Sequence, residues 1–104
     1  MKLDIASLRC ISQVALLGSV TPNLRAVIVT FDSKYIRLFF YYDHSPSEEE
    51  EELAEEVATE LISDCTEYMI ETEKTTMAYP QTIPEKKDGI FIYHRYEPLP
   101  PILH

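Results

Sequence analysis

The chain has 104 residues, a length that fits one domain and leaves no room for a second independent core. Its hydrophobic content of 45% and aromatic content of 11% are typical of a folded globular protein and exclude an intrinsically disordered chain. A net charge of −9 disfavours direct binding to nucleic acid or anionic membranes, and no apolar stretch approaches the ~18 to 20 residues that span a bilayer.

The first predicted element is a helix from Asp4 to Leu17, in which apolar residues recur at spacings of three and four. Asp4 is suited to cap it, and Gly18 to end it in a left-handed conformation. Polar residues interrupt the apolar stretch, so we expect a helix of the mature protein and not a signal peptide. We expect Cys10 and Cys65 to be reduced and buried on helix faces, which favours a cytoplasmic location, although a disulfide between them stays open.

Two β-strands are predicted next, over residues 24–31 and 35–42, and a short polar loop joins them as a hairpin. One face of the first strand carries Leu24, Ala26, Ile28 and Thr30. One face of the second strand carries Tyr35, Arg37, Phe39 and Tyr41. Because tyrosine and arginine are enriched at protein interfaces, this second face is a candidate partner-binding surface. The alternative is that the first helix or the loop 80–88 covers it.

The second predicted helix begins at Ser45, with Pro46 at its first position and Glu48 at its third, and runs to about Cys65. Apolar residues from Leu53 onward form one stripe at helical spacing, and the opposite face is acidic. At ~1.5 Å per residue, this acidic ridge is roughly 25 to 30 Å long. The residues that we assign to a second candidate partner-binding surface are Glu48, Glu49, Glu52, Glu55, Glu56 and Glu60.

The negative charge is concentrated around this helix. Residues 43–73 hold thirteen acidic residues and no lysine or arginine, so the whole negative excess lies in one block. Such a block repels phosphates and anionic lipids, and it attracts a basic protein partner and accelerates their encounter. The alternative is a solvated helix face that only keeps a small protein soluble.

The remaining predicted elements are a third strand over residues 67–79, a long loop with two prolines up to residue 88, and a fourth strand over residues 89–96. The order α-β-β-α-β-β predicts an α+β fold of two layers, with the helices on one face of a mainly antiparallel four-stranded sheet. We expect a single domain over residues 1–97 and an extended proline-rich tail over residues 98–104.

The sequence carries no recognisable signature of catalysis. The three histidines, His44, His94 and His104, lack partners at metal-ligand spacing. The two glycines are too far apart for a phosphate-binding loop, and no nucleophile-elbow motif is present. We therefore predict a protein that is not an enzyme and that needs no cofactor or metal.

Residues 15–27 (ALLGSVTPNLRAV) resemble a group of short bacterial proteins that share the pattern ALLGxVxPNLRAV. Those proteins continue with an aromatic strand like residues 39–43, an acidic helix like residues 55–60 and a tyrosine-proline pair like residues 79–80. Some of them are identified as immunity proteins of contact-dependent growth inhibition systems. The chain departs from them in lacking a glycine near His44 and in adding the proline-rich tail.

The resemblance implies an immunity protein that neutralises a cognate bacterial toxin by stoichiometric binding. We expect the toxin to be a nuclease, whose domain is basic because its substrate is a polyanion, and the acidic helix fits that surface. Two alternatives stay open from the residues alone. The first is a small adaptor or regulatory protein, as a monomer or a homodimer, and the second is a small enzyme whose active site is assembled from distant residues.

Overall fold

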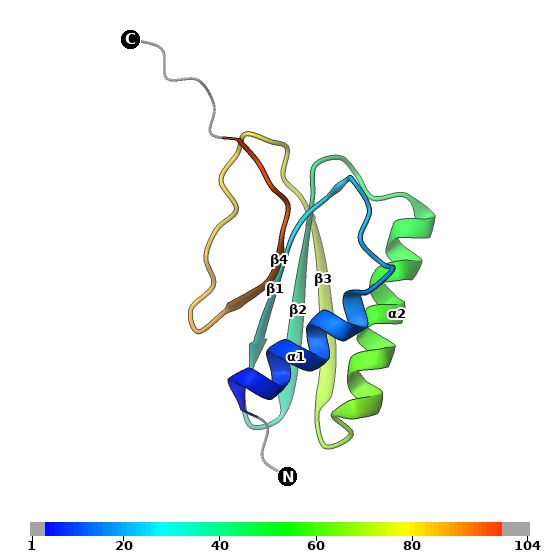
Figure 1. The fold of residues 1–104 in the computed structure, drawn as a ribbon, viewed down its shortest axis with the longest axis vertical. Helices are drawn as coiled ribbons and strands as arrows, with labels where there is room; N and C mark the ends of the chain where they lie inside the picture. Colours follow the sequence, from blue (N-terminus) through cyan, green and yellow to red (C-terminus); the bar gives the residue numbers. More distant parts are fainter. Residues whose placement is uncertain (1–3, 99–104) are drawn as a thin grey trace.

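The computed structural model describes residues 4–98 and confirms the α+β fold and the predicted order of elements (Figure 1). The helices and strands, in chain order, are α1 (Ile5–Leu16), β1 (Leu24–Phe31), β2 (Tyr35–Tyr42), α2 (Glu48–Asp64), β3 (Met69–Thr76) and β4 (Ile90–His94). The third and fourth strands are shorter than predicted. Apart from Pro98, the tail predicted for residues 98–104 lies outside the described residues.

The four strands form one sheet in the order β3-β2-β1-β4. β1 pairs with β2 and with β4 in antiparallel fashion, whereas β2 and β3 are parallel. The parallel pair arises because α2 carries the chain back to the end of the sheet at which β2 began. The sheet is therefore mixed but mostly antiparallel. Both helices lie on the same face of it, with α1 contacting β4 and α2 contacting β3 (Figure 1).

The main core lies between the helices and the sheet. Its helical side includes Leu8 and Ala15 from α1 and Val57 and Leu61 from α2, all of them almost fully buried. The strands contribute alternate residues, which in β2 are Ile36, Leu38, Phe40 and Tyr42. A register shift in β1 between Leu24 and Ala26 turns Leu24 into this core, although strict alternation predicts that it shares the face of Ala26.

The opposite face of the sheet is partly closed by the loop between β3 and β4. Ile83 from this loop packs with Ala26, Ile28 and Tyr41 in a second, smaller core. The loop returns to the sheet at Gly89, where an added Cβ atom would lie 2.9 Å from Ile28 Cγ2. Only glycine fits such a close approach, so the loop covers this part of the sheet tightly.

The start of α2 differs from the prediction. The N-cap is Ser47 and not Ser45, and Glu50 occupies the third helical position. The Ser47 hydroxyl accepts a hydrogen bond from the Glu50 backbone N–H, while the Glu50 carboxylate accepts one from the Ser47 backbone N–H. Both serines have a glutamate three residues later, as the capping motif requires. In the structure it is Ser47 and Glu50 that form the reciprocal pair. The predicted end near Cys65 is confirmed, since Cys65 is the C-cap.

The prediction for α1 is confirmed at its ends and wrong on one face. Asp4 caps the helix by accepting a hydrogen bond from Ser7 N–H, and Gly18 has a φ of 80° just beyond the last turn. Cys10, however, is exposed, because the side of α1 that meets the sheet is set by Leu8 and Ala15. Cys65 is buried as expected.

Candidate interaction surface

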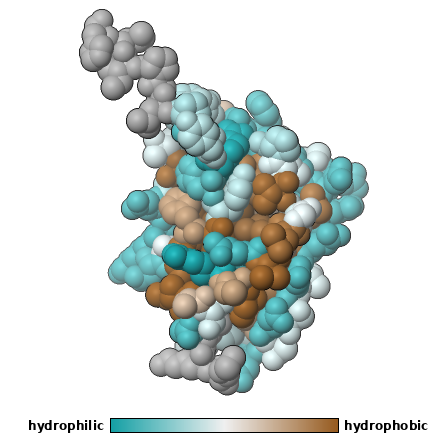
Figure 2. Space-filling model, viewed as in Figure 1, coloured by the Kyte–Doolittle hydropathy of each residue, from teal (hydrophilic) through white to brown (hydrophobic). Residues whose placement is uncertain are grey.

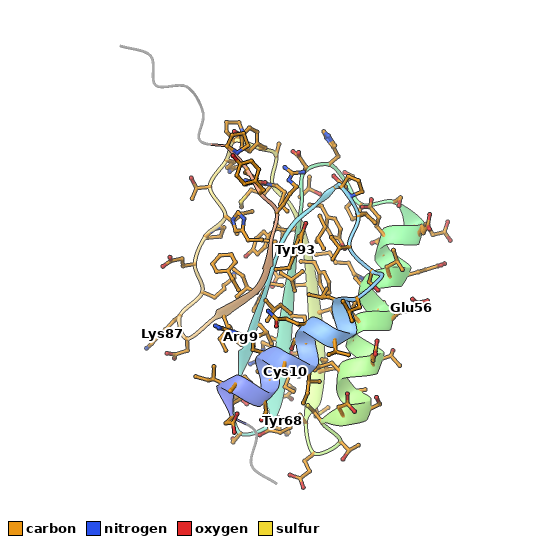
Figure 3. All side chains as sticks on the ribbon, in the orientation of Figure 1. Arg9, Cys10, Glu56, Tyr68, Lys87 and Tyr93 are labelled. Carbon is orange, nitrogen blue, oxygen red and sulfur yellow. The ribbon has the colours of Figure 1, made fainter. Side chains whose placement is uncertain are left out.

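The outward face of α2 carries most of the predicted acidic ridge. The helix rests on the sheet through Ala54, Val57, Ala58 and Leu61, which are buried at spacings of three and four. Figure 3 shows Glu56 on this helix, on the side away from the sheet. Five of the six predicted glutamates are exposed and make no side-chain hydrogen bond or ion pair within residues 4–98; they are Glu48, Glu49, Glu52, Glu56 and Glu60.

Glu55, the sixth predicted glutamate, has an internal role. Its carboxylate accepts hydrogen bonds from Lys74 Nζ at 2.6 Å and from Thr72 Oγ1 at 3.1 Å, and so it joins α2 to β3. The hydrogen bond from Lys74 is the main reason why the pKa of Glu55 lies below its ordinary value. A shallow groove runs between this side of α2 and β3, lined by glutamates, Thr59, Ser63 and Lys74.

Glu50 also belongs to the fold and not to the free acidic surface. Its carboxylate accepts hydrogen bonds from Thr21 Oγ1 and Asn23 Nδ2, in the turn before β1, in addition to closing the cap of α2. Burial alone would raise the pKa of Glu50, but the hydrogen bonds from Ser47, Thr21 and Asn23 outweigh it and lower that pKa. Asn23 further exchanges hydrogen bonds with the backbone of His44. Residues 21–23 therefore join the turn before β1 and the backbone at His44 to the start of α2.

The second candidate surface, on β2, does not form one continuous exposed patch. Tyr41 is only 3% exposed and lies in the smaller core, and Phe39 is half-buried with Lys86 Nζ 4.5 Å from its ring centre. The loop 80–88 thus covers this half of the face, which is one of the two arrangements that the sequence left open. Tyr41 is therefore too buried to contact a partner directly.

The other half of the β2 face remains accessible but is internally paired. Arg37 donates hydrogen bonds to Glu71 at 2.8 Å and to Asp32 at 3.3 Å, and its guanidinium lies 4.8 Å from the ring centre of Tyr35. These residues lie on the face of the sheet opposite the helices. The two candidate surfaces are therefore on opposite sides of the molecule, and the structure does not bring them together.

A buried charge network, which sequence reasoning missed, lies near the end of the sheet. Arg25 in β1 is 2% exposed and donates two hydrogen bonds to Glu97, at 2.7 and 2.8 Å, and a third to the Met77 carbonyl. Arg95 also binds Glu97 and reaches Asp43 at 3.1 Å. The only sequence signal was an arginine within a strand of apolar residues. The arginine of the PNLRAV motif, Arg25, therefore has a structural role in this network.

The described residues offer no cluster of side chains typical of a metal site. No group of three or more histidine, cysteine, aspartate or glutamate side chains within residues 4–98 is placed to hold a metal ion. Cys65 is buried, and burial raises the pKa of its thiol, which disfavours the reactive thiolate. Neither α1 nor α2, the helices of the described part, has the length and apolar content needed to cross a bilayer.

Comparison with known proteins gives the chain its family. A search of curated proteins finds no significant match. A family model described as MafI2 immunity protein matches residues 5–97, which is nearly the whole described structure. Proteins of such immunity families are typically non-enzymatic, in agreement with the prediction from sequence, and membership implies neutralisation of a cognate MafB toxin. The chain therefore belongs to the MafI2 immunity protein family.

Proposed function

We propose that this immunity protein acts in the cytoplasm and neutralises a nuclease toxin by one-to-one binding, with the exposed glutamates of α2 meeting a basic surface of the toxin. The resemblance noted in the sequence supports a toxin that belongs to a contact-dependent growth inhibition system. The observation that carries the proposal is the row of exposed carboxylates, since Glu48, Glu49, Glu52, Glu56 and Glu60 have no partner within residues 4–98.

The physical argument concerns charge complementarity. A domain that cleaves nucleic acid presents positive charge to its polyanionic substrate. An acidic helix of 17 residues, roughly 25 Å long, presents negative charge to such a surface and competes with the nucleic acid for it. Opposite charges also accelerate the encounter, which suits a protein that must bind a toxin before the toxin acts.

Two charge-reversal variants test this proposal. Glu52→Lys with Glu56→Lys alters the free ridge and leaves Glu55 with its partner Lys74. Glu73→Lys with Glu85→Lys makes the same change in net charge on exposed residues, one in β3 and one in the loop between β3 and β4. We expect the first pair to weaken binding about a hundredfold or more, because like charges at an interface cost several kcal/mol. The second pair should change binding by less than about threefold, because its charges lie outside the contact.

The measurements are the dissociation constant for the toxin encoded beside the immunity gene, and the inhibition of its cleavage of DNA and RNA. Circular dichroism establishes that each variant is folded. Equal losses in both variants, or a loss only in the second, would remove α2 from the interface and favour the β2 face. A toxin that cleaves neither nucleic acid would overturn the nuclease assignment and leave the test of the surface intact.

A further inference from the structure

An unexpected feature of α1 is the apolar character of the side that faces away from the sheet. Residues at spacings of three and four on this side are Ala6, Cys10, Val14 and the C-cap Leu17, all of them exposed. Val14 is 53% and Leu17 77% exposed. Figure 3 shows Cys10 on this outer side, and Val20 in the following turn is exposed as well. The helix is therefore apolar on two sides, of which only one is covered.

Single exposed hydrophobic residues are common and need no explanation. Here two of the seven large exposed hydrophobic residues of the described chain, Val14 and Leu17, lie on this one side of α1, and Val20 follows in the next turn. Figure 2, which views the helical side of the molecule, shows hydrophobic residues along α1, interrupted by a hydrophilic band, and hydrophilic residues over α2. The clustering distinguishes this stripe from the scattered pattern of an ordinary surface.

The neighbouring charge favours one occupant of the stripe. Exposed Arg9 lies beside Ala6 and Cys10, but the free glutamates of α2 make the larger charge nearby. α1 contacts α2, whose outward residues Glu49, Glu52, Glu56 and Glu60 lie in the same helical layer. A second copy of the chain, docked through α1, would bring two acidic helices close together and repel itself. A basic partner with an apolar centre is attracted by α2 and buries the stripe. Interfaces commonly combine such an apolar centre with a charged rim.

We propose that Ala6, Cys10, Val14 and Leu17 form the apolar centre of the toxin-binding surface, and that the free glutamates of α2 form its acidic rim. This inference rests on the proposed function, because it assigns the occupant of the stripe to the toxin. It adds a second helix to the interface. It also adds apolar burial on α1 to the charge attraction that α2 contributes.

The first test uses the thiols that the chain already has. Cys10 is exposed and Cys65 is buried, so a maleimide reagent labels Cys10 selectively in the folded protein. Mass spectrometry then gives the rate of labelling with and without the toxin. We expect the toxin to slow labelling of Cys10 by about tenfold or more, because a thiol at the centre of an interface is shielded from water. Unchanged labelling in a saturated complex overturns the inference.

The second test substitutes the stripe without adding charge. Val14→Gln with Leu17→Gln should weaken toxin binding by about tenfold or more, because the centre of an interface carries most of its affinity. The matched control is Met69→Gln with Tyr96→Gln, two exposed hydrophobic residues outside α1, and it should bind like the unmodified protein. Equal binding by both variants overturns the inference.

The results also separate this inference from the proposed function. If the unmodified protein does not bind or inhibit the toxin, the proposed function fails. If it binds, and charge reversal on α2 weakens binding while the stripe variant and Cys10 labelling are unaffected, only the role of α1 fails. Shielding of Cys10 that grows with protein concentration in the absence of toxin identifies a second copy as the occupant and overturns the inference.

Discussion

Replacing Arg25 with alanine should destabilise the fold by about 3 kcal/mol. Its guanidinium makes a two-pronged contact with Glu97 and a 2.6 Å hydrogen bond to the Met77 carbonyl, so it joins β1 to the segments that follow β3 and β4. At 2% exposure, water cannot replace these contacts. Removing one partner of a buried ion pair typically costs about 3 to 5 kcal/mol, because the other charge is left without its partner.

We expect the lower end of that range because Glu97 keeps a second partner. Arg95, which is partly exposed, donates hydrogen bonds to Glu97 at 2.9 and 3.2 Å. Because this ion pair remains after the substitution, the carboxylate stays partly neutralised. A domain of this size is stable by about 5 to 15 kcal/mol, so the loss is a large share of the total. At roughly 4 °C or more per kcal/mol, the melting temperature should fall by about 12 °C or more.

Urea unfolding followed by circular dichroism measures this loss, and Arg37→Ala is the matched control. Arg37 also pairs with two carboxylates, but its side chain is 38% exposed, and surface ion pairs contribute about 1 kcal/mol or less. The reasoning is refuted if Arg25→Ala destabilises the protein no more than Arg37→Ala does. At a temperature where the variant is folded, Arg25→Ala should bind the toxin normally, because the residue is buried away from the proposed interface.

Two further predictions concern the fold. Ser47→Ala should cost about 1 kcal/mol, whereas Ser45→Ala should stay within about 0.5 kcal/mol, because only Ser47 caps α2; equal values in urea unfolding would contradict the assigned cap. The pKa of Glu97 is lowered chiefly by its hydrogen bond from Arg25. The stability that Glu97 contributes is therefore present above its ordinary pKa of 4.5 and is lost as pH falls through its lower pKa in the folded protein. Unfolding free energy should therefore decline with acid below about pH 5, and less steeply in Glu97→Gln; an unchanged slope would show that Glu97 is not a source of the decline.

The element order and fold class could be predicted from sequence because each element has a strong local pattern. Strand β1 is rich in β-branched residues, α2 has an apolar stripe at helical spacing, and Asp4 and Gly18 mark the ends of α1. Details that depend on distant contacts were predicted less well. The choice of Ser47 over Ser45 is decided by Glu50, which is held in place by Thr21 and Asn23 from another part of the chain.

The same limit applies to the candidate surface. In the sequence, Glu55 is indistinguishable from Glu52 and Glu56, yet of these three only Glu55 accepts a hydrogen bond from Lys74 of β3. Burial of Arg25 and Tyr41 likewise depends on segments that lie far away in the chain, and no local pattern reveals it. On the outer side of α1 the prediction that Cys10 is buried is wrong, because periodicity identifies an apolar side without showing what covers it.

The fold divides the acidic residues of the block 43–73 into carboxylates that are paired within the molecule and carboxylates that are free on α2. Asp43, Glu50, Glu55 and Glu71 are bound by partners within the molecule, so their charges contribute to folding. In the proposed complex the free carboxylates of α2 also act before contact, over the screening length of about 8 Å at physiological salt, so they speed the arrival of a basic partner. In the same proposed complex the stripe on α1 acts only after contact, so it slows the departure of the partner. On the opposite side of the sheet, Arg37 already pairs with two carboxylates and the loop covers Tyr41, which leaves the helical side as the one that combines both effects.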